Sequence, residues 1–405
     1  MTIQSAVGVT LTYAAESTFG TAASAGGTSQ VLRRVSSSLV PSKETFQSNE
    51  VRQDYQVSDL RHGMRSARGS IEGELSIQSY DDFLQALLGG TWASGVSCSP
   101  SDFATGVTIA TSGTTSTLTF AGAGSLLTKG FKIGDIVRGT GLTNPANNAK
   151  NLRIVALTAT VMTVTPAITA TTQQASGWSV AVAGKKLTVG ATKRSFSIEQ
   201  SYLDVDISEL FTGCRINSGS IRVPPNGMTT VSFDILGQNG VVLPAAQAPY
   251  FTAATAAPNT SIVAGLDGGL RFAGAERAVV TSLDLNFTNG MSVTPVIGAT
   301  VSPDVFQGRK VVTGNVSAFL EDESLINVFL NETEADLVVM LPTSTGSPQD
   351  FLTLNMQRVK LSGISHSIGA DGGVIIQFPF QALLANGGAA TAYDSSSLVI
   401  QRSNT

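Results

Sequence analysis

One stretch of this sequence occurs twice, and this repeat constrains the fold more than any other feature. Residues 70–88 match residues 311–329 at a constant separation of 241 residues (312 − 71 and 329 − 88). In both copies an alternating apolar and polar run predicts a half-buried strand, and the amphipathic run after it predicts a short helix. In the first copy, Ser79 is expected to cap this helix and Gly89 to end it. The matching residues are Ile71, Gly73, Leu75, Ser76, Asp81, Leu84 and Leu88 in the first copy, and Val312, Gly314, Val316, Ser317, Asp322, Leu325 and Phe329 in the second.

A β-hairpin pattern is also repeated. Residues 215–221 match residues 358–364 at a separation of 143 (358 − 215), and residues 231–235 match residues 376–380 at a separation of 145 (376 − 231). Turn-forming residues lie between the paired runs, at 225–227 in the first copy and at 371–373 in the second. Strand, helix and hairpin recur in the same order, which predicts a duplicated domain. The separations of the two repeats differ by 98 residues (241 − 143), so the first copy is expected to contain an insertion.

The predicted fold class is mainly β, with two tandem β-sandwich domains, each with a short flanking helix, and a small inserted β-sandwich or barrel. In the inserted part, short strand patterns rich in Thr, Ala, Gly and Val alternate with turns about every eight to twelve residues. Its ends, near Gly95 and Gly184, are expected to lie close together. The small, polar residues 1–30 are expected to form an arm or loop. The predicted parts are a first domain of residues 1–95 together with 184–243, an inserted domain of 96–183, a linker of 244–269, a second domain of 270–387 and a C-terminal tail of 388–405. This tail is small and polar apart from one apolar patch at residues 398–400.

Charged residues are scarce in this chain. They make up 13% of the sequence, against a usual value of about 25%, so Ser, Thr, Gly and Asn must cover much of the surface. Such a surface is easily desolvated, which suits wide contact between copies of the chain, although a Thr-rich β domain would have the same composition. The net charge of −4, without a basic patch, argues against a nucleic-acid-binding protein. Cys98 and Cys214 are expected to be isolated small apolar residues in a reducing compartment.

Neither secretion nor membrane insertion is predicted. Residues 1–20 lack the basic start and the continuous apolar core of a signal peptide. The chain also lacks an apolar run of about 18 residues, so a membrane-spanning helix is not expected.

The segment between Pro41 and Arg68 holds much of the charge of the chain. Positive and negative residues alternate along it, which argues against a DNA-binding arm. A long loop of mixed charge within a domain usually has a function. Two interpretations remain open: a solvated loop, or a protruding loop that pairs its charges with a neighbouring subunit. The charged residues are Lys43, Glu44, Glu50, Arg52, Asp54, Asp59, Arg61, Arg65 and Arg68.

The sequence predicts no catalytic, cofactor-binding or metal-binding site. The two histidines, His62 and His366, lack partners at the spacing that a zinc site or a catalytic triad requires. Residues 204–215 begin like a calcium-binding loop, but Glu209 stands where the loop requires Gly, and Arg215 stands where it requires Glu. We therefore expect that the protein is not an enzyme and that it uses no cofactor.

Three segments together resemble the major tail tube proteins of bacteriophages with long, non-contractile tails, the siphovirus type. They are residues 16–21 (ESTFGT), residues 61–84 and residues 210–236. The resemblance implies tail-tube β-sandwich domains, rings stacked into a hollow tube, and a location in the virion tail after assembly in the host cytoplasm. It also implies as partners a tape-measure protein inside the tube, a tail terminator and distal tail proteins, while DNA passes without specific binding. A duplicated tube domain implies homotrimeric rings with pseudo-sixfold symmetry.

Two groups of residues are candidates for roles in such a tube. Glu72 and Glu74 alternate with the apolar Ile71 and Leu75, so they should face away from the core, as acids of the lumen or of an interface. The second group forms a predicted inter-ring loop and comprises Glu50, Arg52, Asp54, Asp59, Arg61 and Arg65.

The alternative function is a β-rich adhesin or carbohydrate-binding surface protein. The aromatic content of 6% and the missing signal peptide count against it.

Overall fold

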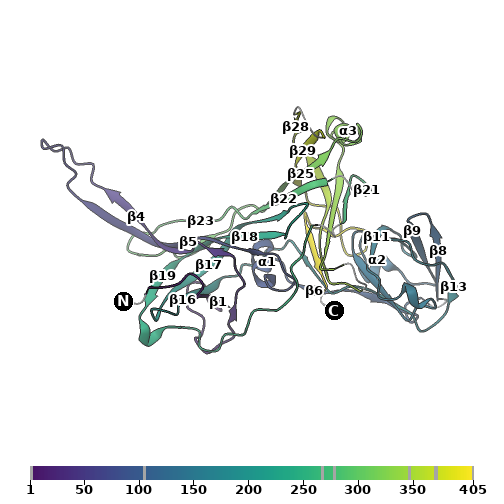
Figure 1. Cartoon of the computed structure of the whole chain (residues 1–405), viewed down its shortest axis with the longest axis horizontal. Coiled ribbons are helices and arrows are strands. Elements are labelled where there is room, and N and C mark those ends of the chain that lie inside the picture. The colour runs from purple at the N-terminus through teal and green to yellow at the C-terminus, as the bar shows by residue number, and fades with distance from the viewer. Residues whose placement is uncertain are drawn as a thin grey trace.

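The protein is described by a computed structural model that covers residues 3–103, 106–265, 269–276, 280–344, 348–368 and 373–403 (Figure 1). The prediction of a mainly β fold is confirmed, because strands far outnumber helices in this part of the chain. A long hairpin projects from one end of the molecule, and a separate sheet lies at the other end. Of the second predicted turn, residues 371 and 372 lie outside the described residues.

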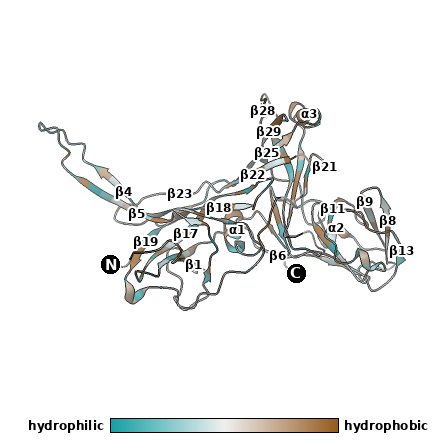
Figure 2. Ribbon diagram, viewed as in Figure 1, coloured by the Kyte–Doolittle hydropathy of each residue, from teal (hydrophilic) through white to brown (hydrophobic). Residues whose placement is uncertain are grey.

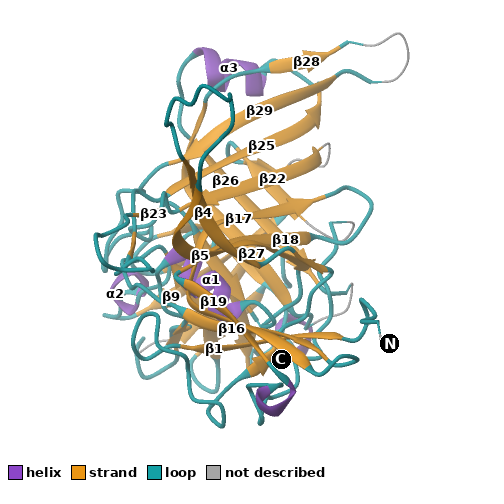
Figure 3. Ribbon diagram, turned by 90° about the vertical axis from the view of Figure 1, so that its left-hand side faces the viewer, coloured by secondary structure: helices purple, strands orange, loops and turns teal. Residues whose placement is uncertain are grey.

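A continuous antiparallel sheet forms the middle of the molecule (Figure 3). Its strands follow the order β3 and β4, β5, β18, β17, β22, β25, β29 and β27. The pair β17–β22 joins a strand of the first predicted copy to a strand of the second, so the two copies share this sheet. The strands are β3 (Ser36–Ser37), β4 (Val40–Gln47), β5 (Leu60–Glu74), β17 (Ile207–Val223), β18 (Thr230–Gly237), β22 (Val280–Thr288), β25 (Val311–Phe319), β27 (Phe351–Leu361) and β29 (Ile375–Ala382).

One apolar core extends under both copies. Phe233 from the first copy and Leu285 and Phe378 from the second belong to the same buried cluster. Burial of each such side chain stabilises the fold by roughly 1.5–3 kcal/mol relative to exposure. The two copies are therefore joined through one continuous core, with no solvated gap between them. The repeat alone did not predict this close association.

A second layer contains a strand from the N-terminal residues. β1 (Val9–Ala15) pairs along its whole length with β16 (Phe196–Tyr202), and Leu11 and Tyr13 are buried. The expectation of an arm or loop is therefore wrong for these residues. Leu11 and Tyr13 alternate with threonines, which is the strand pattern. The other short strands here are β2 (Gln30–Val31) and β19 (Asn239–Leu243).

The two repeated helices differ in burial. α1 (Asp81–Leu88) buries five side chains, and the Phe83 ring lies 5.3 Å from that of Phe196 and 5.4 Å from that of Phe233. As predicted, α1 ends at Gly89 in a left-handed conformation. The predicted cap at Ser79 is wrong, because the buried Ser79 hydroxyl accepts a hydrogen bond from Ser76 Oγ. α3 (Ser324–Leu330), in contrast, buries only Leu325.

Residues 96–183 contain an eight-stranded sheet with its own buried cluster around Phe103, Phe120 and Trp178. The Gly95 N–H donates to the Gly184 carbonyl at 3.1 Å, so the two ends of this segment meet as expected. The elements are β7 (Ser97–Cys98), β8 (Gly106–Ser112), β9 (Thr115–Ala121), α2 (Leu126–Lys129), β10 (Ile136–Thr140), a 3-10 helix (Pro145–Asn147), β11 (Leu152–Leu157), β12 (Val161–Thr165), β13 (Thr171–Gln174) and β14 (Ser179–Val182).

The C-terminal residues form a buried strand. β30 (Val399–Arg402) lies between β15 (Lys185–Thr188) and the first half of β27, with Leu398 and Ile400 fully buried. The expected polar tail is therefore wrong for these residues, since their apolar patch lies within the core. The remaining elements are β6 (Ala93–Ser94), a 3-10 helix (Ala245–Gln247), β20 (Gly269–Phe272), β21 (Ala275–Glu276), β23 (Ser292–Val293), β24 (Val305–Phe306), β26 (Ala335–Pro342) and β28 (Ser365–Ser367).

Candidate assembly and lumen surfaces

One face of the central sheet is polar from β5 to β29. Side chains directly opposite each other on paired strands point to the same face. The row through Glu72 runs across Ser232, Ser220, Asn286, Thr313 and Gln381. We call the following residues the polar face: Ser70, Glu72, Glu74, Ser218, Ser220, Arg222, Thr230, Ser232, Asp234, Asp284, Asn286, Thr288, Thr313, Asn315, Gln377 and Gln381.

The adjacent row faces the core. It runs from Ile71 through Phe233, Gly219 and Phe287 to Val312, and its side chains are buried. The prediction that Glu72 and Glu74 face away from the core is confirmed, because Glu72 is exposed and Glu74 half-buried, whereas Ile71 and Leu75 are fully buried. Their role in a lumen or an interface stays a prediction.

The polar face carries a net negative charge. Its acids are Glu72, Glu74, Asp234 and Asp284, and its cation Arg222 forms an ion pair with Asp284 at 2.7 Å. Two further cations border it on the same side of the sheet, Arg68 just before Ser70 on β5 and Lys360 opposite Gln381 on β27. Glu72 accepts a hydrogen bond from Ser36 Oγ at 3.1 Å. The alternation of apolar and polar residues in the sequence identified the two glutamates. Asp234 and Asp284 could be assigned to the same face only from the strand register in the structure.

The charged segment between Pro41 and Arg68 is a β-hairpin rather than a long loop. β4 and the first part of β5 pair along it, and only residues 48–59 form the loop at its tip (Figure 1). The expectation of a loop is therefore wrong for the strands. The many charged side chains hid the strand pattern, because a two-stranded arm in solvent has no buried face that would impose an apolar alternation.

Four of the six predicted inter-ring residues pair with each other inside the hairpin. Arg52 binds Asp54 at 2.9 Å, and Arg61 binds Asp59 at 2.8 Å. The hydrogen bond from Arg52 lowers the pKa of Asp54. Glu50 and Arg65 are exposed.

Apolar side chains of the hairpin are exposed beside these charges. Tyr55 is 98% exposed and Val51 is 97% exposed. Phe46, Val57 and Leu60 are also exposed. Figure 2 shows hydrophobic and hydrophilic residues mixed along this arm. A projecting arm with this many exposed apolar side chains is typical of a protein–protein contact.

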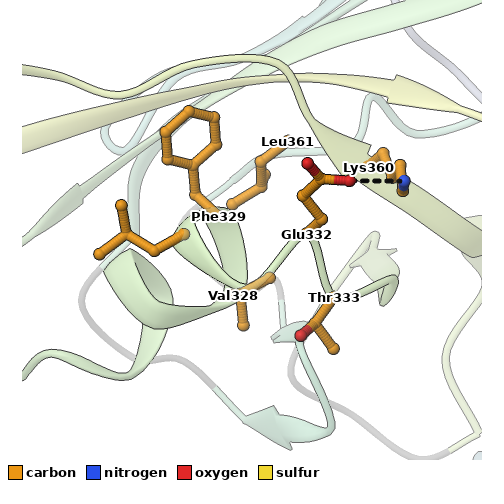
Figure 4. A pocket seen from close by; sticks show the side chains of 7 residues that line it. Val328, Phe329, Glu332, Thr333, Lys360 and Leu361 are labelled. Carbon is orange, nitrogen blue, oxygen red and sulfur yellow. Dashed lines mark ion pairs between the residues drawn. The ribbon is translucent and has the colours of Figure 1, made fainter.

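A pocket lies where α3 meets β27 (Figure 4). Val328, Phe329 and Leu330 line it from the helix, and Lys360 and Leu361 line it from the strand. Lys360 Nζ lies 3.8 Å from a carboxylate oxygen of Glu332 at the rim. Leu330 is 66% exposed, so the apolar side of this helix is only partly covered.

No metal-binding group of side chains is found in the described part of the chain. This part contains no group of three or more His, Cys, Asp or Glu side chains placed to hold a metal. His62 and His366 are both exposed. The two cysteines are free and buried, as expected, and burial raises the pKa of Cys98 to about 12. No described helix is long and apolar enough to cross a membrane.

Comparison with known proteins identifies the family. No curated protein matches the chain. A family model described as phage tail tube protein matches residues 7–382, which include both copies of the repeat and the inserted sheet. The chain therefore belongs to the phage tail tube protein family.

Proposed function

We propose that this phage tail tube protein forms trimeric, pseudo-sixfold rings that stack into the hollow tube of a siphovirus-type tail. The observation that carries the proposal is the continuous sheet with its polar face. Each half of the chain supplies its strands in a matching order: β3 and β4, β5, β18 and β17, then β22, β25, β29 and β27. Repetition of such a sheet by a closed rotation gives a ring with one face turned inward.

The order of these strands also supports duplication of a tube domain. The strands in matching places, β5 with β25, β18 with β29 and β17 with β27, are the ones that carry the sequence repeat. We infer a first domain of residues 1–95 with 184–243 and a second of 270–387, linked by residues 244–269, with 388–405 as a C-terminal segment. The separate core of residues 96–183 supports an inserted domain, which would project outside the tube.

The charge of the polar face suits a channel for DNA. Each Lys or Arg that neutralises a phosphate releases counterions and so adds affinity for DNA. A lumen lined with Ser, Thr, Asn and Gln, and with more carboxylates than arginines, would therefore let DNA pass without binding. In this proposal the β4–β5 hairpin reaches the next ring. The tube forms in the host cytoplasm around a tape-measure protein and ends on the tail terminator and distal tail proteins.

Electron microscopy of the purified protein tests the proposal directly. We expect hollow rings or tubes in negative stain. Isolated elongated particles, at concentrations up to the limit of solubility, would contradict the proposed assembly and favour the adhesin alternative.

Reversal of charge on the polar face tests the role of the lumen. The variant Glu72→Lys/Glu74→Lys should still form tubes, because both side chains face away from the core. Phage carrying it should release DNA roughly tenfold more slowly, since rings of lysines would bind phosphates. The matched control Glu72→Gln/Glu74→Gln adds no cation and should release DNA at the wild-type rate. Wild-type release by the lysine variant, measured by dye uptake on DNA ejection, would remove Glu72 and Glu74 from the lumen.

A further inference from the structure

The central sheet has an unpaired edge at each end. At one end, β3 pairs only with β5 among the described residues, and the neighbouring Val35 and Val40 are 65% and 53% exposed. At the other end, β26 covers β27 only as far as Val359. Beyond that point, Leu361 of β27 and Ser365 and His366 of β28 pair with β29 on one side, and no described strand pairs with their other side. Residues 362–364 connect the two strands, and the Ser362 N–H donates to the Pro379 carbonyl of β29. Unpaired edges of this kind are ready to add a strand.

An equivalent pairing of two such edges occurs within the chain, between β17 and β22. β22 pairs with β17 from Ser218 opposite Thr288 to Val223 opposite Leu283. On β17 this contact begins just beyond the end of β16, which pairs with β17 only as far as Cys214. The open edge of β27 likewise begins just beyond the end of β26. β22 lies beside β25 as β3 lies beside β5.

The internal junction also covers the end of the first repeated helix. Lys310, just before β25, donates from Nζ to the carbonyl oxygens of Leu88 and Gly190. Asn289, just after β22, donates from its side chain to the Ile216 carbonyl at 2.9 Å. The Leu88 side chain is 3% exposed. Its repeat partner Phe329 lines the pocket beside α3 and is only half-buried.

We propose that a second copy of this chain covers the open end of the sheet at β27 and β28. The β3–β4 edge of one protomer, residues 35–40, pairs antiparallel with residues 361–366 of the next. The base of the β4–β5 hairpin of the first protomer then fills the pocket lined by Phe329 and Leu330. This inference rests on the proposed ring and names the surfaces that close it. The contact is head-to-tail, so every protomer uses one edge of each kind.

Two edge variants test this pairing. Val35→Asp/Val40→Asp blocks the β3–β4 edge, and Leu330→Asp/Ile368→Asp blocks the opposite edge and its pocket. All four side chains are more than half exposed, so both variants should keep the wild-type fold, which far-UV circular dichroism measures. Each variant alone should be a monomer in size-exclusion chromatography with light scattering. Their equimolar mixture should form a dimer of twice 41.8 kDa and no ring, because each variant keeps the edge that the other lacks.

The controls separate this inference from the proposed function. Ala110→Asp/Thr119→Asp adds the same charge to exposed positions of the inserted sheet and should assemble like the wild type. Rings or tubes from either edge variant would overturn the pairing but leave the proposed tube intact. Two monomeric variants that do not dimerise when mixed, at a concentration at which the wild type is fully assembled, would also overturn it. Absence of rings and tubes from the wild type would instead contradict the proposed function.

Discussion

Replacement of the hairpin tip, residues 48–59, by an Asn-Gly turn is expected to leave rings intact and to abolish stacked tubes. A two-residue Asn-Gly turn suits the right-handed twist of the paired strands, so β4 and β5 should still pair. The deletion removes Val51, Tyr55 and Val57, whose exposed apolar side chains are available for a contact with the next ring. Negative-stain microscopy should show single rings of normal diameter, and sedimentation should show the loss of long particles.

Variants at the tip distinguish apolar contact from ion pairing. Val51→Ser/Tyr55→Ser should shorten the tubes strongly, because it removes the two most exposed apolar side chains of the arm. Arg52→Ala/Asp54→Ala should have little effect, because an exposed ion pair contributes only about 0.2–1 kcal/mol. Tubes of normal length from the protein with the shortened hairpin would show that rings stack through another surface.

The sequence predicted the strand and helix of each copy because one face of them is buried. Ile71 and Gly73 of β5 and Leu75 directly after it alternate with polar residues, and Phe83, Leu84 and Leu87 share the buried face of α1. The hairpin of residues 40–74 was predicted less well, since its outer half has no core to impose a pattern. The two glutamates of the polar face were found by alternation, but Asp234 and Asp284 required the register between distant strands.

The terminal strands show a different limit of sequence analysis. β30 has four residues, and its partners β15 and β27 lie about 210 and 50 residues away in the sequence. A run this short carries no measurable period, so its place in a sheet depends on long-range contacts.

A buried polar network connects the C-terminal segment to the inserted sheet. Gln401 accepts from the Ile136 N–H at 2.8 Å and donates to the carbonyls of Ile136 and Ala183.

A buried ion triad beside this network joins three distant segments. Lys186 Nζ lies 2.6 Å from Asp135 Oδ1 and 2.8 Å from Asp394 Oδ2, and the Asp135 side chain is only 2% exposed. Burial raises the pKa of Asp135 to about 6, although the ammonium group of Lys186 opposes this shift. Burial also acts to lower the pKa of Lys186, but the two carboxylates raise it overall.

Substitution Lys186→Met is therefore expected to destabilise the protein by about 3–5 kcal/mol at pH 7, because it leaves the Asp135 carboxylate buried without its cation. Urea unfolding measures the loss, in the assembly-blocked Val35→Asp/Val40→Asp background so that association adds nothing to stability. The matched control is Lys129→Met, which breaks a more exposed pair with Asp102 and should cost no more than about 1 kcal/mol. Removal of the Asp135 charge as well, by Lys186→Met/Asp135→Asn, should recover much of the loss, because only the more exposed Asp394 carboxylate then lacks its cation and the Lys132 N–H keeps an acceptor.

The pH dependence of this variant gives a second, independent check. Loss of Lys186 removes the group that opposes the upward shift, so the pKa of Asp135 should rise further above its value in the unfolded chain. The folded variant then binds a proton that the unfolded chain releases, and its stability falls as the pH rises from about 4 through the folded pKa. The deficit relative to the wild type should accordingly be largest above the folded pKa of the variant and should shrink by about 1.4 kcal/mol for each unit that the pH falls from there to about 6, the wild-type pKa, below which both proteins gain stability in parallel. A deficit that stays constant between pH 5 and pH 8 would show that Lys186 acts through packing and not through its charge.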